Sequence, residues 1–394
     1  MTDPRPVPSA RKFSARLSSF YAALFVYSGI HLPFFPLWLE AKGLEAGAIG
    51  IVLALPMVLR IFAIPTATGL ADRHDTLRGA LIATSVAATL GYAALGLTSG
   101  LLAIAVVYAL VSLAFTPTMP LADAFALKGL ARIGGSYGRV RLWGSGAFLV
   151  GSFLAGVAID LIAARDLIWL VAAAMGLSAL AAFGLTPLPA DPVAPGSVPS
   201  PADGLLRNKA FLVAIGAASL TNASHALYYG FSTLDWKAAG IDGTAIGLLW
   251  AVGVLAEIVL FAFAGRLPAR IGPIELLLIG AGGAVLRWTA MAFDPPVAVL
   301  PFLQVLHALS FGANHLGAIL FISRVAAPGQ AATAQGYFSI ALGLTMAVTT
   351  SLSGWLFARY GDLAYAAMAL SGLAGGAGAL LAYRLRRTGT ATGL

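Results

Sequence analysis

The sequence predicts an all-α integral membrane protein in which twelve transmembrane helices form two six-helix bundles. Its composition is 59% hydrophobic and 10% charged, whereas a soluble domain is about 45–50% apolar and about 25% charged. Apolar runs recur at the length of about 20 residues that a membrane-spanning helix needs. The second half of the chain also repeats the pattern of the first. With 16 acidic and 24 basic side chains, the 394 residues cannot cover a water-exposed surface.

The chain divides at charged or Gly/Pro-rich breaks into apolar stretches that we interpret as spanning helices. A β-barrel would show short alternating strands, whereas these runs are long, continuous and rich in Ala, Leu and Gly. Pro117 and Pro120 should kink the fourth run, because proline cannot donate the helical hydrogen bond. The twelve predicted spans lie at 17–40, 47–70, 77–98, 101–127, 138–162, 167–186, 208–236, 244–267, 273–293, 296–324, 331–358 and 363–384.

The basic residues predict the orientation in the membrane. If the N-terminus is cytoplasmic, seventeen Lys and Arg residues fall at inside ends and loops, and only four fall outside. This bias is the positive-inside rule, so we expect a multi-pass protein of a bacterial inner (plasma) membrane with both termini in the cytoplasm. The net charge of +8 then reflects topology and requires no nucleic-acid partner. The chain has no cysteine, which excludes a thiolate metal site or a catalytic thiol.

A proline-rich segment separates the two sets of six predicted helices. Thr186–Gly204 contains six prolines, which predicts an extended cytoplasmic linker. The expected organisation is therefore an N-terminal bundle at 1–186, a linker at 187–206 and a C-terminal bundle at 207–394.

The two halves are related by an internal repeat. A shift of 197 residues aligns Gly43–Gly50 with Gly240–Gly247, and 12 of 40 positions are identical between 34–73 and 231–270. A parallel repeat of six helices is an architecture of secondary transporters, with the substrate site between the halves. In the same alignment, Arg60 of the first half is equivalent to Glu257 of the second half.

Ionisable groups at membrane depth are the main candidates for functional residues, because each costs several kcal/mol or more to bury. Asp123 and Arg141 lie nine residues on either side of Arg132, in the predicted loop between helices four and five. They should therefore sit at equal depth and form an ion pair, which either binds a substrate carboxylate or hydroxyl or only braces the two helices. The full set comprises Arg60, Asp123, Arg141, Glu257, Arg287, His31, His225, His307 and His315.

Polar residues also recur at helical spacing in three predicted spans. In the tenth span, His307, Ser310, Phe311 and Asn314 follow the i, i+3, i+4, i+7 pattern, with His315 beside them, which predicts one polar stripe facing a cavity. Similar spacings relate Asn222, His225 and Tyr229, with Tyr228 beside them, in the seventh span, and Tyr27 with His31 in the first.

Glu257 is predicted to lie near the bilayer midplane, about 13 residues from the outer end of its helix. Arg287 is expected nearby on the ninth helix. An arginine that approaches and recedes as the two halves move would favour release and then uptake of a proton by this carboxyl group. We therefore interpret the two residues as a means of coupling transport to protons.

Three motifs give the chain a resemblance to a known family. Pro33–Leu39, Tyr137–Ser145 and Leu303–Gly317 resemble the major facilitator superfamily, in particular the phenylpropionate permease family and the lactose-permease-like oligosaccharide:proton symporters. The resemblance implies that Asp123 and Arg141 bind substrate and that Phe148 is a stacking platform.

The same resemblance assigns Glu257, Arg287 and His307 to the proton and substrate machinery. Ser310 departs from the pattern, since the sugar symporters carry a second carboxylate there. Asp72 and Arg73 match an inner-gate motif, in which Asp75 replaces an expected glycine.

We therefore predict a secondary active transporter that works by alternating access, a proton-coupled symporter of a small organic acid, for which the resemblance favours an aromatic one. A sugar or nucleoside is the alternative substrate. A membrane sensor or enzyme on this fold is disfavoured, because we find no sizeable output domain and neither a nucleophile with a base nor a metal cluster. No Gly-rich ATP-binding motif occurs, so we do not expect this chain to hydrolyse ATP itself. We expect a monomer without cofactor or metal. The candidate substrate-binding residues are Asp123, Arg141, Phe148, Tyr27, His31, His225, Tyr228, Asn314 and His315; those for proton coupling are Glu257, Arg287 and His307; Arg60 is a cavity charge; Asp72 and Arg73 form the gate.

Overall fold

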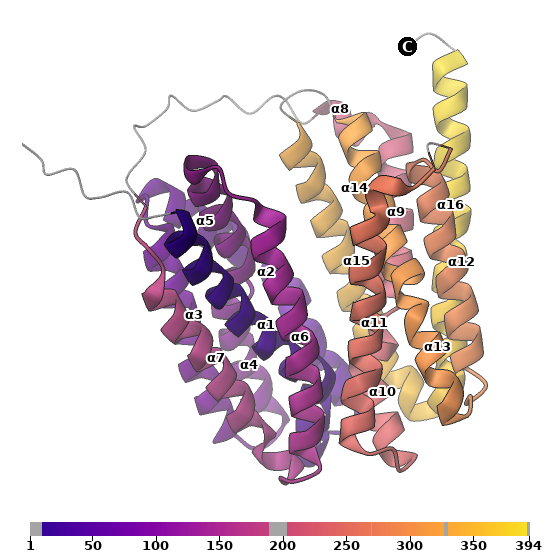
Figure 1. Ribbon diagram of the computed structural model, residues 1–394. Helices are drawn as coiled ribbons and strands as arrows, with labels where there is room; N and C mark the ends of the chain where they lie inside the picture. Colours follow the sequence, from indigo (N-terminus) through magenta and orange to yellow (C-terminus); the bar gives the residue numbers. More distant parts are fainter. Residues whose placement is uncertain (1–9, 189–202, 269, 327–329, 392–394) are drawn as a thin grey trace, which may run out of the picture. The chain divides into compact units, whose positions relative to one another are not determined.

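The computed structural model describes residues 10–188, 203–268, 270–326 and 330–391. The described residues are almost entirely helical and contain no strand, which confirms the predicted fold class. They fall into two compact units (Figure 1). The first joins the residues up to Gly43 to those from Leu59 to the proline-rich segment, and the second joins Leu44–Val58 to the residues after that segment. Most of the predicted linker, 189–202, lies outside the described residues.

The first six predicted spans fall in the first unit, except for the first half of the second span, which groups with the second unit. The fourth span is broken at Thr116 and Pro117, which confirms the kink predicted from the prolines. A short 3-10 turn, η1 (Ala164–Asp166), precedes the last helix. The helices are α1 (Ala10–Ala41), α2 (Ala46–Arg73), α3 (Leu77–Gly96), α4 (Leu101–Phe115), α5 (Thr118–Ile133), α6 (Tyr137–Ile159) and α7 (Leu167–Gly184).

The second unit contains the last six predicted spans, two of which are interrupted. Its helices are α8 (Asp203–Arg207), α9 (Lys209–Ala223), α10 (Ala226–Ala238), α11 (Gly243–Phe263), α12 (Pro273–Met291), α13 (Leu300–Val305), α14 (Asn314–Val325), α15 (Ala331–Tyr360) and α16 (Tyr365–Ala391). The connecting turns are η2 (Ala264–Arg266), η3 (Val297–Val299), the π-helical η4 (Ala308–Ala313) and η5 (Gly361–Ala364).

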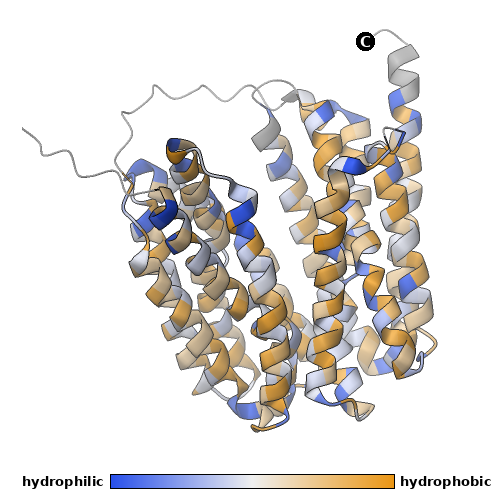
Figure 2. Cartoon of the chain, viewed as in Figure 1, coloured by the Kyte–Doolittle hydropathy of each residue, from blue (hydrophilic) through white to orange (hydrophobic). Residues whose placement is uncertain are grey.

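Eleven described segments are long and apolar enough to cross a membrane. The last, Thr333–Arg386, contains both α15 and α16, so the segments account for twelve crossings. Large apolar side chains such as Phe62, Leu97 and Phe302 are 67%, 80% and 73% exposed. Figure 2 shows apolar residues along the helices and hydrophilic residues gathered toward their ends. Surfaces of this kind fit a lipid environment.

Small residues bring helix backbones together inside each unit, as is common in membranes. A Cβ added at Gly29 of α1 would lie 2.5 Å from the carbonyl oxygen of Phe148 in α6. In the second unit, a Cβ at Gly50 of α2 would lie 2.9 Å from the carbonyl oxygen of Thr350 in α15. This packing explains why the first half of α2 groups with the second unit, although the repeat places the whole helix in the first bundle.

Candidate functional site

The first predicted site, in the first unit, is organised by tyrosines. The hydroxyl groups of Tyr21 and Tyr137 donate hydrogen bonds of 2.6 Å and 2.8 Å to Oδ1 of Asp123. Among the described residues, Asp123 forms no ion pair with Arg141, so the predicted direct pairing is wrong. The carboxylate is satisfied instead by two neutral donors from α1 and α6.

Arg141 reaches the same group of side chains by stacking. Its guanidinium lies 4.1 Å from the ring centre of Phe25 and 5.8 Å from that of Tyr21, and it also interacts with Tyr137. The shared tyrosines confirm that Asp123 and Arg141 lie at a common depth. Sequence reasoning missed both tyrosines, although Tyr137 begins the motif that contains Arg141.

A second cluster in this unit surrounds His31. The ring of Tyr27 stacks on His31 with centroids 5.3 Å apart, which confirms the predicted common face. The Tyr27 hydroxyl is hydrogen-bonded to that of Tyr92, and Nε2 of His31 lies 3.3 Å from the Tyr108 hydroxyl. Phe148 is buried where α1 and α6 approach each other closely, and the described ring contacts of this cluster do not include it. Tyr92 and Tyr108 lie in helices where no polar spacing pattern marked them.

The predicted gate residues Asp72 and Arg73 are exposed at the end of α2. The ion pair near this end joins Asp75 to Lys128 of α5 at 2.6 Å. Asp75 has φ +46°, a left-handed conformation that favours glycine. This conformation explains why the gate motif is expected to have a glycine at this position. Arg60 lies in the middle of α2, as predicted, and its side chain is half-buried; its role as a cavity charge stays a prediction.

The second unit buries a charged network around Arg287 of α12. The guanidinium is 0% exposed. One terminal nitrogen lies 3.1 Å from Nδ1 of His307, and the other donates to Oε1 of Gln304 at 2.5 Å. None of the described groups in contact with the guanidinium is a carboxylate, and its Nε has no hydrogen-bond partner in the described structure.

His307 lies between Arg287 and the carboxyl group of Glu257. Its Nε2 is 3.5 Å from Oε2 of Glu257. Arginine can only donate, so Nδ1 accepts from Arg287 and the ring proton of neutral His307 is on Nε2, facing Glu257. The three residues predicted for proton coupling therefore form one chain, from α12 through the α13–η4 junction to α11.

His225 occupies the break between α9 and α10, which the sequence did not predict. Its Nδ1 lies 3.0 Å from the Asn222 carbonyl oxygen, and its Nε2 lies 3.0 Å from Oγ of Ser310. Because a carbonyl only accepts, Nδ1 donates and the Ser310 hydroxyl donates to Nε2. Ser310, where the sugar symporters carry a carboxylate, is thus bonded to a histidine.

The tenth predicted span does not present one polar stripe. The π-helical η4 changes the angular spacing, because it has more residues per turn than an α-helix. The ring of Phe311 stacks on His307 and His315, with centroids at 5.2 Å and 5.8 Å. Ser310 and Asn314 contact α9 and its C-terminal end instead, and the Asn314 amide donates to the Ala218 carbonyl oxygen at 2.9 Å.

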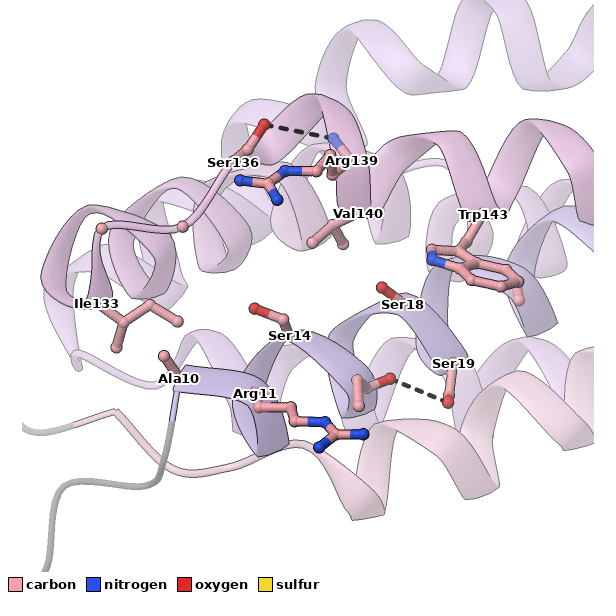
Figure 3. Close-up of a pocket in the computed structure, with 14 residues that line it drawn as sticks. Ala10, Arg11, Ser14, Ser18, Ser19, Ile133, Ser136, Arg139, Val140 and Trp143 are labelled. Carbon is pink, nitrogen blue, oxygen red and sulfur yellow. Dashed lines mark hydrogen bonds between the residues drawn. The ribbon is translucent and has the colours of Figure 1, made fainter.

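The first unit also contains an open pocket of about 580 Å³. The start of α1 and the α5–α6 loop form its walls, and Ser14, Ser18 and Arg139 lie along it (Figure 3). None of the predicted substrate-binding residues lines it. The predicted substrate-binding residues are instead buried or half-buried within the two units.

Comparison with known proteins identifies the family. The family model described as "MFS_1 like family" matches residues 14–366. The chain is 31% identical, over 90% of its length and 93% of the relative's, to a probable 3-phenylpropionic acid transporter of Escherichia coli (strain K12). It is 29% identical, over 86% and 87%, to a maltose permease of Geobacillus stearothermophilus.

Solved structures show the same fold. The nucleoside transporter NupG superposes with a TM-score of 0.76 and 16% identity, covering 95% of this chain and 98% of NupG. A bacterial homolog of the human lysosomal transporter Spinster gives a TM-score of 0.72 and 14% identity, covering 96% and 98%. The family match, the near full-length relatives and the helical units agree, and the chain belongs to the MFS_1-like family of multi-pass membrane transporters.

Proposed function

We propose that this transporter is a proton-coupled symporter of a small aromatic carboxylate. The observation that carries the proposal is the uncompensated charge of Arg287. A fully buried cation is costly unless an anion and hydrogen bonds satisfy it. A substrate carboxylate would supply that negative charge, and the unpartnered Nε of Arg287 offers a donor for it.

The surroundings of Arg287 favour an aromatic substrate. The guanidinium lies 4.6 Å and 4.5 Å from the ring centres of Tyr228 and Trp288. Tyr228 also stacks on Trp250 at 4.6 Å, and Nε1 of this tryptophan has no hydrogen-bond partner in the described structure. Such rings provide apolar contact together with polar edges. The name of the 31% identical relative, a probable 3-phenylpropionic acid transporter, supports the same substrate class.

The chain of three side chains supplies a physical basis for coupling. An ionised Glu257 places a negative charge next to His307. This carboxylate and an anionic substrate therefore compete for electrostatic stabilisation by Arg287. Protonation of Glu257 removes that competition, so proton and carboxylate should each raise the affinity for the other. We place this exchange in the inner membrane, with both termini in the cytoplasm, in a protein that acts as a monomer.

Reconstituted proteoliposomes test the proposal. Uptake of 3-phenylpropionate, maltose and uridine should be measured with and without an inward-directed proton gradient, in which the exterior is more acidic than the interior. We expect uphill accumulation of 3-phenylpropionate only with the gradient. Gradient-driven uptake of maltose or uridine instead would overturn the substrate class, and accumulation of 3-phenylpropionate independent of pH would overturn the coupling.

A further inference from the structure

Gln304 of α13 is a buried amide that binds Arg287 directly. Its side chain is 0% exposed, and its Oε1 accepts a hydrogen bond of 2.5 Å from one terminal nitrogen of the guanidinium. A guanidinium only donates hydrogen bonds, so the amide must turn its oxygen toward Arg287. The amide nitrogen Nε2 has no hydrogen-bond partner in the described structure. Arg287 therefore fixes the orientation of this side chain and leaves its N–H donors unused.

Other unused donors lie on neighbouring side chains. Nε of Arg287 and Nε1 of Trp250 also lack hydrogen-bond partners among the described residues. Tyr228 joins these two side chains, because its ring centre lies 4.6 Å from the guanidinium and 4.6 Å from the ring centre of Trp250. The helices α11 and α13 are adjacent here, since a Cβ at Gly253, one turn after Trp250, would lie 3.6 Å from the Gln304 carbonyl oxygen. Buried N–H groups are normally paired, so this set indicates a ligand that supplies acceptors.

The other hydrogen-bond partner of Arg287 offers no such donor. Nδ1 of His307 lies 3.1 Å from the guanidinium and accepts from it, while Nε2 of the same ring lies 3.5 Å from Oε2 of Glu257. Both ring nitrogens of His307 are therefore engaged. Gln304 differs, because it accepts from Arg287 and still has an amide nitrogen that can donate to a ligand.

The uncharged side chain at position 304 has an electrostatic consequence. A glutamate of the same length could accept hydrogen bonds from Arg287 in the same place and would form a charge-assisted pair with it. Since an uncompensated buried charge is strongly destabilising, that pair would favour the folded state. Gln304 instead orients the guanidinium without neutralising it. The second unit therefore keeps a positive charge in its interior, with a neutral donor beside it.

From this geometry we propose that Gln304 sets the selectivity of the transporter for a negatively charged ligand. Its Oε1 orients Arg287, and its Nε2 donates a hydrogen bond to the substrate carboxylate beside Nε of the guanidinium. The proposal rests on the carboxylate binding by Arg287 proposed above, and it names the neutral residue that leaves this charge available. A carboxylate has two oxygens that only accept, so it fits these donors, whereas a carboxamide brings no negative charge and has donors of its own.

The test compares the binding of 3-phenylpropionate and its uncharged analogue 3-phenylpropionamide to the purified full-length protein by titration calorimetry. Gln304→Glu supplies a carboxylate next to Arg287 and should therefore exclude that of the substrate. We expect the wild type to prefer the acid by about 100-fold. Gln304→Glu should lose this preference while it binds the amide within about threefold of wild type. A side chain that only packed α13 in place would not change the choice between acid and amide.

Two further variants separate charge from hydrogen bonding. Gln304→Met has a similar length but no amide, so affinity for the acid should fall about tenfold, the size of one charge-assisted hydrogen bond. The acid should still be preferred over the amide, because the charge of Arg287 remains. Gln335→Glu, at an exposed position of α15, is the matched control for the added carboxylate and should behave as wild type.

The outcomes separate this inference from the proposed function. A wild type that binds the acid no better than the amide refutes carboxylate binding by Arg287 itself. A wild type that prefers the acid, with the same preference in Gln304→Glu or the same acid affinity in Gln304→Met, refutes only the role of Gln304. An equal change in Gln335→Glu also refutes that role. If Gln304→Glu binds neither ligand, the affinity of Gln304→Met for the acid decides the question.

Discussion

The two units treat their buried charges in opposite ways. In the first unit, Asp123 and Arg141 carry opposite charges and meet the same tyrosines, which satisfy the carboxylate at 2.6 Å and 2.8 Å. In the second unit, Arg287 is completely buried, and its nearest partners, His307 and Gln304, carry no negative charge. In the first site, the opposite charges balance each other without a ligand. In the second site, Arg287 carries a positive charge that a bound anion would neutralise. This difference is the reason that the proposed carboxylate-binding role falls on Arg287 and not on Arg141.

The largest effect is expected from Arg287→Gln. If this guanidinium binds the substrate carboxylate, its loss should lower uptake of 3-phenylpropionate about 100-fold, as for a buried charge contact of about 3 kcal/mol. Initial uptake rates in proteoliposomes measure it. Arg359→Gln, at an exposed position, is the control and should retain near wild-type rates; equal losses in both would remove the special role of Arg287.

Glu257→Gln should separate transport from accumulation. The neutral amide mimics the protonated carboxyl group, so exchange of labelled for unlabelled substrate should continue. Uphill accumulation driven by a pH gradient should be lost, because no proton is taken up or released at this position. The paired exchange and accumulation assays measure both, and accumulation by the variant at wild-type levels would contradict the role of Glu257.

Asp123→Asn should have a smaller effect on affinity than Arg287→Gln. The amide retains an oxygen that accepts from Tyr21 or Tyr137, but it loses the negative charge of the site. We expect about a tenfold rise in the apparent substrate KM, the size of one charge-assisted hydrogen bond. Tyr137→Phe should raise KM less. If Asp123→Asn lowers the apparent affinity for substrate more than Arg287→Gln does, the comparison between the units is reversed.

The smallest effect is expected from Ser310→Ala. This change removes one hydrogen bond to His225 and leaves the chain from Arg287 through His307 to Glu257 intact. Uptake should stay within about threefold of wild type, the equivalent of less than 1 kcal/mol. Loss of pH-driven accumulation in Ser310→Ala would show that this position carries coupling even without the carboxylate found in the sugar symporters.

The sequence predicted features that depend on composition and regular spacing. Apolar run lengths placed the spans, Pro117 marked the helix break, and equal separation from Arg132 brought Asp123 and Arg141 to one depth. These predictions succeed because helix geometry and burial in lipid act on local sequence. The predicted roles of these residues in binding and coupling remain to be tested.

Features that depend on tertiary contacts were not predictable. The π-helical η4 redirected Ser310 and Asn314 toward α9, although an ideal helix would place them beside His307. Tyr21, and not Arg141, is a direct partner of Asp123, because α1 also packs against α5. The break between α9 and α10 at His225 contains no proline, so the sequence gives no signal for it. In each case the partner lies far away in the chain, where local spacing gives no signal.

The central claim is that Arg287 binds the carboxylate of the substrate. The most direct measurement compares the binding of 3-phenylpropionate and its uncharged analogue 3-phenylpropionamide to the purified wild type and to Arg287→Gln by titration calorimetry. We predict that the wild type prefers the acid by about 100-fold and that the variant loses most of this preference. Equal discrimination between acid and amide in the two proteins would contradict the account.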